Sequence, residues 1–474
     1  MLFNSLPFLY FFIFVFVVQH FLGTWGTARK IFLLLASYAF YMFWSVPFVL
    51  LLVGSIVLDY FVGLALHRNE RPRTRKLLIG MSLVVNLGAL AFFKYANFIV
   101  ESAGAVAGLV GVPISTQALN IVLPLGISFY TFQTLSYSID MYRRERPPCT
   151  SMLDFMLYVM FFPQLVAGPI VRSSEFLPQL RKKYRFHSAK FFYGLILLCI
   201  GLFKKVLIAD RLAPFVEDVY ANPAEAGLIM AWAGTIAFAF QIYCDFSGYS
   251  DMAIGMARMM GFDFSRNFNL PYLAKGFSDF WRRWHISLST WLRDYLYISL
   301  GGNRRSDLRT LINLMITMLL GGLWHGASWT FVIWGGLHGM YLIVERLLAK
   351  SFGRAAFVKS IMSSRLGSMG CVALTFIGVC FAWVFFRADT VAEASTLCQA
   401  MLGLKGLGRM SDVPMKALFL MGVIAVAILV QWRKAMDFRF ARLSPWLVGA
   451  TMLALILVLE LWGAGQQEFI YFQF

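Results

Sequence analysis

Long apolar stretches separated by short polar loops dominate the pattern of this chain. Runs that are almost free of charged residues include Phe8–Leu22, Ile31–Trp44, Phe48–Leu66, Leu195–Val206 and Leu447–Leu461. Several reach the roughly 20 residues that a helix needs to cross about 30 Å of hydrocarbon. In lipid the backbone must satisfy its own hydrogen bonds, and apolar residues here run continuously instead of alternating, so helices are predicted and not a membrane β-barrel. We expect an all-α polytopic membrane protein with about eleven spanning helices plus re-entrant and interfacial ones.

Composition and charge agree with a membrane protein. Of 474 residues 59% are hydrophobic and only 14% are charged, whereas a soluble domain carries about a quarter charged residues. The net charge of +18 comes from Lys and Arg in short loops beside apolar runs, where such residues favour the cytoplasmic side. These loops also suit anionic lipid headgroups or a phosphorylated cofactor. Membrane lipids, and not nucleic acid, are therefore the expected partners.

The N-terminal run is predicted to be a retained helix. The first Lys or Arg is Arg29, after the run, so the positive region of a cleaved signal is missing and the N-terminus is expected on the outer, periplasmic side. No linker is long enough to divide the chain, so residues 1–474 are expected to form a single membrane-embedded domain.

The stretch Cys244–Arg309 mixes aromatic and ionisable residues at a density that lipid-facing helices do not tolerate, so chemistry is expected there. At 100° per residue, Phe280–Tyr297 is predicted to be one amphipathic interfacial helix. Its apolar face carries Trp281, Trp284 and His285, and its polar face carries Arg282, Arg283, Arg293 and Asp294. His285 is either a core histidine bonded to a backbone carbonyl or a functional residue; spacing alone leaves both open.

His325 is the strongest catalytic candidate. It lies at a polar break between the apolar segments Leu311–Leu323 and Ser328–Leu342, which predicts a re-entrant hairpin. The neighbouring Gly321, Gly322 and Gly326 allow backbones to approach closely. A buried neutral imidazole is a suitable general base for acyl transfer, which needs a base for the incoming hydroxyl and donors for the oxyanion. His338, thirteen residues further on, is a weaker candidate.

Other motifs narrow the chemistry. Helix breakage is predicted near Gly168–Pro169, and Gln241–Gly255 carries acidic and hydroxyl groups within a bundle. The six cysteines lack metal or haem spacing and are expected to be small core residues. No metal site is expected, and neither a phosphate loop nor a dinucleotide fingerprint is present in the sequence.

Several of these segments resemble the bacterial membrane-bound O-acyltransferases, most closely the branch that acts in alginate O-acetylation. The resemblance rests on FFPQLVAGPIVR, QIYCDFSGYSDMAIG, FWRRWHISLSTWLRDYLYISLGGNR, GLWHGASW and the terminal FIYFQF. It implies a ring of tilted helices around a central tunnel, with His325 as the catalytic histidine and His285 as the second family position. It also implies a bacterial inner-membrane location and an acyl thioester donor on the cytoplasmic side. Partner periplasmic acetyltransferases would finish transfer to a polysaccharide.

Residues and resemblance together predict that His325 activates the acceptor while His285 orients the thioester or supports the oxyanion. Trp324 and Ser328 would shape the pocket, and Arg282, Arg283 and Arg293 would receive the phosphates of a CoA-like donor; acetyl-CoA and an acyl-carrier thioester both remain open, with no bound cofactor. Two alternatives remain. One is a transporter or flippase for a polysaccharide or lipid precursor; the other is an acyltransferase acting on peptidoglycan, lipid or protein.

Overall fold

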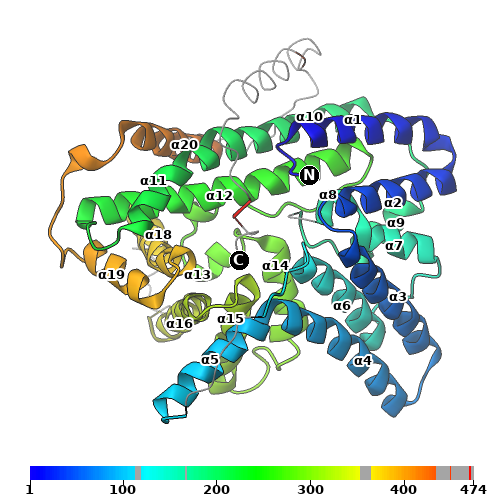
Figure 1. Cartoon of the computed structure of the whole chain (residues 1–474), viewed down its shortest axis with the longest axis horizontal. Coiled ribbons are helices and arrows are strands. Elements are labelled where there is room, and N and C mark those ends of the chain that lie inside the picture. The colour runs from blue at the N-terminus through cyan, green and yellow to red at the C-terminus, as the bar shows by residue number, and fades with distance from the viewer. Residues whose placement is uncertain (113–118, 166–167, 353–363, 434–448, 450–468, 471–474) are drawn as a thin grey trace. The chain divides into compact units, whose positions relative to one another are not determined.

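The computed structural model describes residues 1–112, 119–165, 168–352, 364–433, 449 and 469–470, and within these ranges all regular structure is helical (Figure 1). Six segments are long and apolar enough to cross a membrane: Pro47–Arg68, Pro72–Leu109, Ser188–Ala221, Leu228–Met259, Trp329–Ser351 and Arg365–Arg387. The all-α prediction is confirmed, whereas the expected eleven spans are not tested. Except for residue 449, the apolar run Leu447–Leu461 lies outside the described residues.

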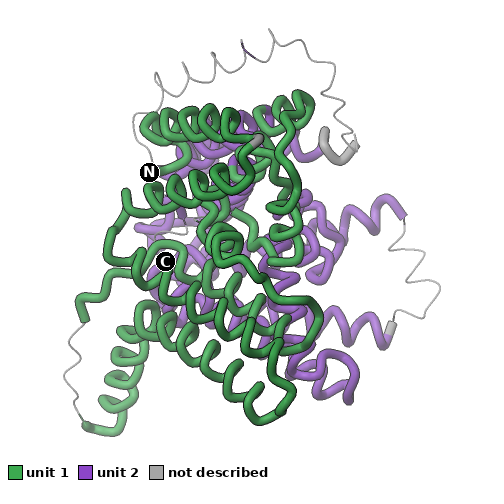
Figure 2. Tube along the Cα trace, turned by 90° about the vertical axis from the view of Figure 1, so that its right-hand side faces the viewer, with its two compact units in different colours: residues 1–195, 253–265 green, residues 196–252, 266–474 purple. Residues whose placement is uncertain are grey.

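The chain divides into two compact units, shown in different colours in Figure 2. Unit 1 comprises Met1–Leu195 and Ala253–Ser265, and unit 2 comprises Ile196–Met252 and Arg266–Phe474. The helices that lie wholly in unit 1 are α1 (Leu6–Phe21), η1 (Leu22–Thr24), α2 (Gly26–Met42), α3 (Pro47–Arg68), α4 (Pro72–Leu90), η2 (Ala91–Tyr95), α5 (Ala96–Leu109), α6 (Ile127–Arg143), α7 (Met152–Met160), α8 (Phe162–Leu165) and α9 (Ser173–Leu180). Helices α10 (Ser188–Leu202) and α12 (Leu228–Met259) contribute residues to both units.

Unit 2 holds the residues that the sequence marked for chemistry. Its remaining elements are η3 (Phe203–Ala209), α11 (Asp210–Ala221), η4 (Pro271–Leu273), α13 (Phe277–Trp281), α14 (Ile286–Trp291), η5 (Leu292–Tyr297), α15 (Asp307–His325), α16 (Trp329–Phe352), α18 (Arg365–Arg387), α19 (Val391–Met401), η6 (Met410–Asp412) and α20 (Met415–Arg433).

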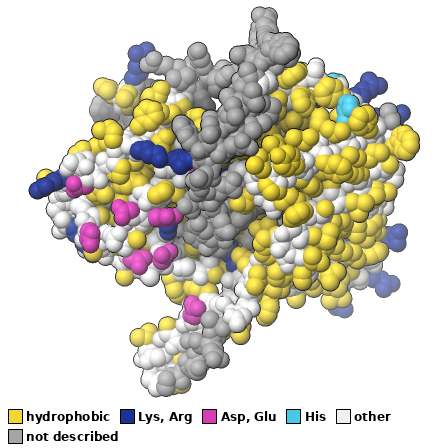
Figure 3. Space-filling view, turned by 45° about the horizontal axis from the view of Figure 1, so that its top comes forward, with side chains coloured by type: hydrophobic (Ala, Val, Ile, Leu, Met, Phe, Trp, Pro, Cys, Tyr) yellow, Lys and Arg dark blue, Asp and Glu magenta, His cyan; other side chains and the backbone are white. Residues whose placement is uncertain are grey.

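Apolar side chains are exposed over a broad area of the face in Figure 3, with Lys and Arg at its margins. Large exposed fractions occur well inside apolar helices, for example 57% at Phe61 and 72% at Val84. Water would make such a surface aggregate, whereas lipid solvates it. The exposed apolar surface is therefore that of a multi-pass membrane protein.

A buried polar network ties three helices of unit 1 together. Asp59 on α3 accepts hydrogen bonds from Ser82 and Asn86 on α4 and from Ser138 on α6, at 2.5, 2.8 and 2.8 Å. The carboxylate is fully buried, so each donor offsets part of the cost of removing it from water. The network fixes which faces of α3, α4 and α6 meet.

The predicted helix break in unit 1 is confirmed. Helix α8 ends at Leu165 and regular helix resumes at Ser173, with Gly168–Pro169 in non-helical backbone between them. Proline cannot donate a backbone hydrogen bond and its ring clashes within a helix, so the chain turns there.

The predicted hairpin around His325 is present, although its second helix is longer than expected. Helix α15 has 19 residues and α16 has 24, and the α16 segment alone is long enough to span a membrane. Helix α16 is longer than the apolar run Ser328–Leu342 indicated, because its polar end at Glu345–Lys350 continues the helix past that run.

Glycines allow α15 and α16 to pack backbone against backbone. A Cβ on Gly335 would lie 2.4 Å from the Met318 carbonyl oxygen, and one on Gly322 would meet the Phe331 carbonyl oxygen at 2.3 Å. Real side chains do not approach a carbonyl so closely, so only glycine fits. The predicted close backbone approach is confirmed at Gly322, whereas Gly321 and Gly326 lie against the side chains of Leu292 and Phe331.

Replacing Gly335 with Ala should push α15 and α16 apart, since the new methyl group has no space to relax into. We expect a loss of roughly 1–3 kcal/mol, measured as a lower thermal unfolding midpoint of the purified protein in detergent. Gly336→Ala is the matched control, because its Cβ would make only an ordinary 3.6 Å contact with Leu319. Equal behaviour of the two variants would contradict close backbone packing as the reason for Gly335.

Candidate active site

The segment that carries His285 is not the continuous helix that its periodicity predicts. Helix α13 ends at Trp281, α14 begins at Ile286, and η5, a π-helical turn, follows from Leu292. His285 lies between α13 and α14 with φ at +41°, a left-handed conformation that is uncommon for residues other than glycine. Hydrophobic periodicity cannot detect one left-handed residue, so the predicted single helix is wrong. Such strained positions cluster at functional sites.

Asn267 holds the break at His285 in place. Its carbonyl oxygen accepts from the Ile286 N–H at 2.9 Å, and its Oδ1 accepts from the Ser287 N–H at 3.1 Å and the Ser287 hydroxyl at 3.0 Å. Its Nδ2 donates to Ser250 Oγ on α12 at 3.2 Å. The start of α14 is thus capped by a buried side chain from an upstream loop, which leaves His285 in a fixed orientation.

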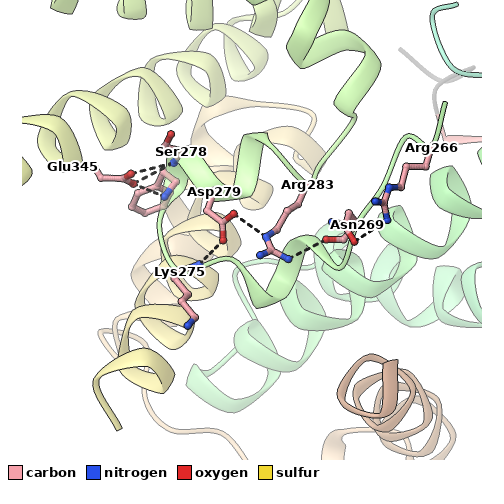
Figure 4. A network of polar contacts seen from close by, with 8 residues as sticks. Arg266, Asn269, Lys275, Ser278, Asp279, Arg283 and Glu345 are labelled. Atoms are coloured by element: carbon pink, nitrogen blue, oxygen red, sulfur yellow. Dashed lines mark hydrogen bonds and ion pairs between the residues drawn. The ribbon is translucent and has the colours of Figure 1, made fainter. Parts of the chain in front are cut away.

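A polar network holds the preceding turn (Figure 4). Glu345 on α16 accepts from the backbone N–H groups of Phe277 and Ser278 at the start of α13. Asp279 accepts from the Lys275 N–H at 3.1 Å and from Arg283 Nε at 2.9 Å. These contacts join α13 to α16 within unit 2.

His325 is the last residue of α15 and lies among aromatic rings. Its ring centroid is 6.4 Å from that of His285, and the Trp324 ring contacts both histidines, at 5.0 Å from His325 and 5.9 Å from His285. Trp334 and Phe386 contact His325 at 4.9 and 5.3 Å. Both histidines are buried. Aromatic surroundings of this kind disfavour a charged imidazole and exclude bulk water.

His338 forms a second aromatic cluster on α16. Its ring lies 4.7 Å from Trp334 and 5.2 Å from Trp281 and stacks on Phe280 at 5.8 Å. Among the described residues, no hydrogen-bond partner is found for either ring nitrogen of His338 or for the Nε1 groups of Trp281 and Trp334. Because Trp334 contacts both His325 and His338, the three predicted histidines share one aromatic interior.

The other candidate residues are a tryptophan, a serine and three arginines. Trp284 is fully buried, stacked on Phe280 at 5.7 Å, so its contacts are packing contacts. Ser328 immediately precedes α16, and its hydroxyl oxygen lies 3.1 Å from that of Thr330. The three arginines differ. Arg283 is paired with Asp279 and Arg293 with Asp294, at 2.9 and 2.7 Å, whereas Arg282 is exposed and forms no ion pair with a described residue.

Sequence reasoning missed a buried ion cluster in the same unit. Lys205 on η3 lies 2.8 Å from both Asp210 and Asp245, and its side chain is 1% exposed. Lys205 lies inside the run Leu195–Val206. Most residues of this run are apolar, so the run looks almost free of charge. The overlooked signal was the Lys204–Lys205 pair within that run, since lysine at this depth needs a carboxylate partner.

This cluster connects the end of the chain to the histidines. Asp245 accepts from the Ile470 N–H at 2.8 Å, and the Phe469 ring lies 5.8 Å from that of Phe246. Phe246 in turn contacts the His285 ring at 4.6 Å. Two of the segments that carry the family resemblance, the one around Asp245 and the one that contains Phe469 and Ile470, therefore meet beside His285.

Comparison of the sequence with known proteins shows the family of this chain. The sequence profile of the membrane-bound O-acyltransferase family matches residues 143–386, a span that contains all three clustered histidines. The chain belongs to the membrane-bound O-acyltransferase family. It is therefore an O-acyltransferase, and the resemblance that the sequence motifs indicated is confirmed.

Relatives of this O-acyltransferase carry several names. The chain is 44% identical over 405 residues to the "probable alginate O-acetylase AlgI" of Pseudomonas aeruginosa, covering 85% of this chain and 75% of that protein. It is 40% identical over 404 residues to a peptidoglycan O-acetyltransferase of Helicobacter pylori, covering 80% and 74%. A teichoic acid D-alanyltransferase of Bacillus subtilis is 27% identical over 285 residues, covering 56% and 69%.

The three buried imidazoles, of His285, His325 and His338, are groups that could carry out acid–base chemistry in this O-acyltransferase. Within the part of the chain that the structure describes, no group of three His, Cys, Asp or Glu residues could hold a metal ion. Four of the six cysteines are buried and all six are free, at positions 149, 199, 244, 371, 380 and 398. Two imidazoles whose ring centroids lie 6.4 Å apart, those of His285 and His325, can move a proton and polarise a carbonyl group that binds between them.

Replacing Asn267 with Ala should loosen the start of α14 and so misplace His285. We expect acyl transfer to fall by at least about tenfold, since small displacements of a catalytic group are costly, with a modest loss of stability from the lost hydrogen bonds. The measurement is acetyl transfer from a thioester donor by the purified enzyme. Asn303→Ala, at an exposed position of unit 2, is the control; an equal loss there would show that Asn267 has no special role.

Proposed function

We propose that this enzyme passes acetyl groups from a cytoplasmic thioester donor across the membrane for the O-acetylation of an extracellular, alginate-like polysaccharide. The observation that carries the proposal is the pair His285 and His325, with ring centroids 6.4 Å apart in a buried aromatic interior, in a chain of this family. Alginate enters through relatives such as the Pseudomonas aeruginosa protein.

His325 is the proposed general base. Its imidazole takes the proton from the attacking hydroxyl as the new oxygen–carbon bond forms, and returns it to the thiolate when the carbon–sulfur bond breaks. The aromatic rings around it keep the imidazole neutral between turnovers and limit hydrolysis of the thioester.

His285 is proposed to orient the thioester or to stabilise the oxyanion. Its backbone position is fixed by Asn267, and a donor that needs no reorganisation stabilises developing charge best. The indole N–H groups of Trp281 and Trp334 are further candidate donors to the acyl carbonyl. Trp324, in contact with both histidines, would shape the pocket with Ser328.

The donor is either acetyl-CoA or an acyl-carrier thioester. Of the three arginines expected to receive its phosphates, Arg282 is the best placed, because its guanidinium group has no ion-pair partner among the described residues, whereas Arg283 and Arg293 have Asp279 and Asp294. We expect Arg282 to contribute most to donor binding.

The acceptor side is proposed to involve partner proteins. Periplasmic acetyltransferases would receive the acetyl group and finish its transfer to the polysaccharide, with the enzyme in the bacterial inner membrane as a single domain and its N-terminus in the periplasm. Peptidoglycan is the second candidate acceptor, which the Helicobacter pylori relative favours.

His325→Ala should abolish ester-linked acetate on the secreted polymer, because loss of a general base costs about 10²–10⁴ in rate. The measurement is ester-linked acetate per sugar residue in a strain whose only copy is the variant, with protein level checked by immunoblot. His67→Ala, at an exposed position, is the matched control. Full acetylation in the His325 variant at normal protein level would refute the assignment; acetate lost from peptidoglycan instead of the polymer would change the acceptor.

For His285→Ala we expect a large loss of transfer without loss of folding. The side chain is fully buried, with the centroid of the Phe246 ring 4.6 Å away, so its removal leaves a small cavity that lowers stability without unfolding the protein. Turnover of an acetyl thioester and the thermal midpoint are measured on the same preparation. Wild-type turnover would make His285 a structural residue.

A further inference from the structure

Unit 1 contains a polar cavity of about 440 Å³ whose residues take no part in the proposed chemistry. Its walls come from α9, from the loop at residues 181–187, from the first turn of α10 and from the turn Gly261–Asp263 that follows α12. Arg29, near the start of α2, also lines it. Segments distant in sequence thus meet around one opening.

Positive charge exceeds negative charge in this cavity. Five cationic side chains line it, Arg29, Lys182, Lys183, Arg185 and Lys190, against the two carboxylates Glu175 and Asp263. Lysines and arginines that face one another repel unless an anion joins them. Such an excess of positive charge raises the affinity of the cavity for an anion.

The carboxylates do not neutralise the three cations of the loop. Asp263 is bonded to Lys190 at 2.6 Å and to Arg258 at 3.1 Å, and Glu175 accepts from Ser265 at 3.3 Å. Burial raises the pKa of Asp263, but its bonds to Lys190 and Arg258 outweigh this effect and the net pKa is lowered, so this carboxylate is ionised and committed at neutral pH.

The charges that no described carboxylate neutralises are those of Lys182, Lys183 and Arg185. All three are exposed, and none forms an ion pair with a residue that the structure describes. They lie within four consecutive positions of a loop without helical structure. Their side chains are long enough to converge on one ligand in the cavity.

Arg29 gives the cavity a fixed cation. It is 7% exposed; its Nε donates to Gln19 at 2.9 Å and its Nη2 to the Met260 carbonyl at 2.7 Å. Its guanidinium lies 4.4 Å from the centre of the Tyr184 ring. Its Nη1 group makes no hydrogen bond to a described residue. Burial lowers the Arg29 pKa to about 10, so the guanidinium stays charged at neutral pH.

Aromatic residues beside the cavity indicate its depth. Phe21 and Trp25 are 79% and 69% exposed just before α2, and Phe186, in the cationic loop itself, is 47% exposed. Exposed aromatic rings next to Lys and Arg mark the boundary between hydrocarbon and water. By this criterion we expect the cavity to open at the level of lipid headgroups.

We propose that this cavity binds a phosphate group at the membrane boundary, carried by an anionic phospholipid headgroup or by a phosphorylated solute. A phosphate presents several acceptor oxygens to converging cations, and a fixed arginine provides the planar donor that suits it. This binding site goes beyond acyl transfer, and its test does not depend on that activity.

The test uses the full chain in two binding experiments. In the first, the protein is placed in nanodiscs that contain equal amounts of phosphatidylglycerol and phosphatidylcholine. It is then released in a native mass spectrometer, which measures how much of each lipid stays bound. In the second, inorganic pyrophosphate is titrated into protein in phosphatidylcholine nanodiscs by calorimetry. The site variant is Lys182→Gln, Lys183→Gln and Arg185→Gln together.

The matched control removes the same charge elsewhere in unit 1. It combines Arg71→Gln, Arg73→Gln and Lys76→Gln, three exposed residues without ion pairs to described residues. We expect the site variant to lose at least about tenfold in one of the two binding measurements, while the control keeps wild-type binding. Lost phosphatidylglycerol retention identifies a lipid ligand, and lost pyrophosphate binding identifies a solute.

Two results would overturn the proposal. If the site variant and the control fall equally, net charge alone explains the binding. If both measurements stay at the wild-type level in the site variant, the cavity is not a phosphate site. Unchanged thermal midpoints, which the exposed positions predict, keep loss of folding out of either comparison.

Discussion

The structure of unit 2 depends on imidazole rings that are buried among indole and phenyl rings. A polar ring removed from water must remain neutral or find donors and acceptors, and aromatic neighbours supply few of them. His285 and His325 lie in such surroundings, 6.4 Å apart. A neutral imidazole held there keeps its capacity to accept a proton for the moment when a hydroxyl arrives, and that is what acyl transfer from a thioester requires.

Each neighbouring structural feature keeps those rings in place. Gly322 and Gly335 bring α15 and α16 into backbone contact, which positions His325 at the end of α15. Asn267 caps α14 and holds the left-handed turn at His285. The ion cluster of Lys205 and Asp245 fixes Ile470, so that the ring of Phe469 packs on Phe246 behind His285. The proposed mechanism needs such rigid packing, because a misplacement of about 1 Å in a catalytic group can cost about a hundredfold in rate.

Much of this could be predicted from the sequence, and the failures have physical causes. Continuous apolar runs predicted helices, and the glycines around His325 predicted close packing, because both effects are local and depend on residue type. The prediction of one continuous helix over Phe280–Tyr297 was wrong. Hydrophobic periodicity shows which face of a helix a residue occupies, but it cannot show that φ changes sign at one residue, His285. The cap by Asn267 joins positions 20 residues apart, and the pairing of Lys205 with Asp245 joins positions 40 apart. Hydrophobic periodicity within one helix cannot reveal such contacts. Their sequence signals, an asparagine in a loop and lysines in an apolar run, gain meaning only with the fold.

The central claim is that buried histidines transfer an acyl group between donors and acceptors on opposite sides of the membrane. The most direct measurement uses sealed proteoliposomes, with radiolabelled acetyl thioester outside and a soluble hydroxyl acceptor enclosed inside, with oriented enzyme. The account predicts labelled ester in the lumen while the thioester itself stays outside. Label that appears in ester only when donor and acceptor share a compartment would contradict it.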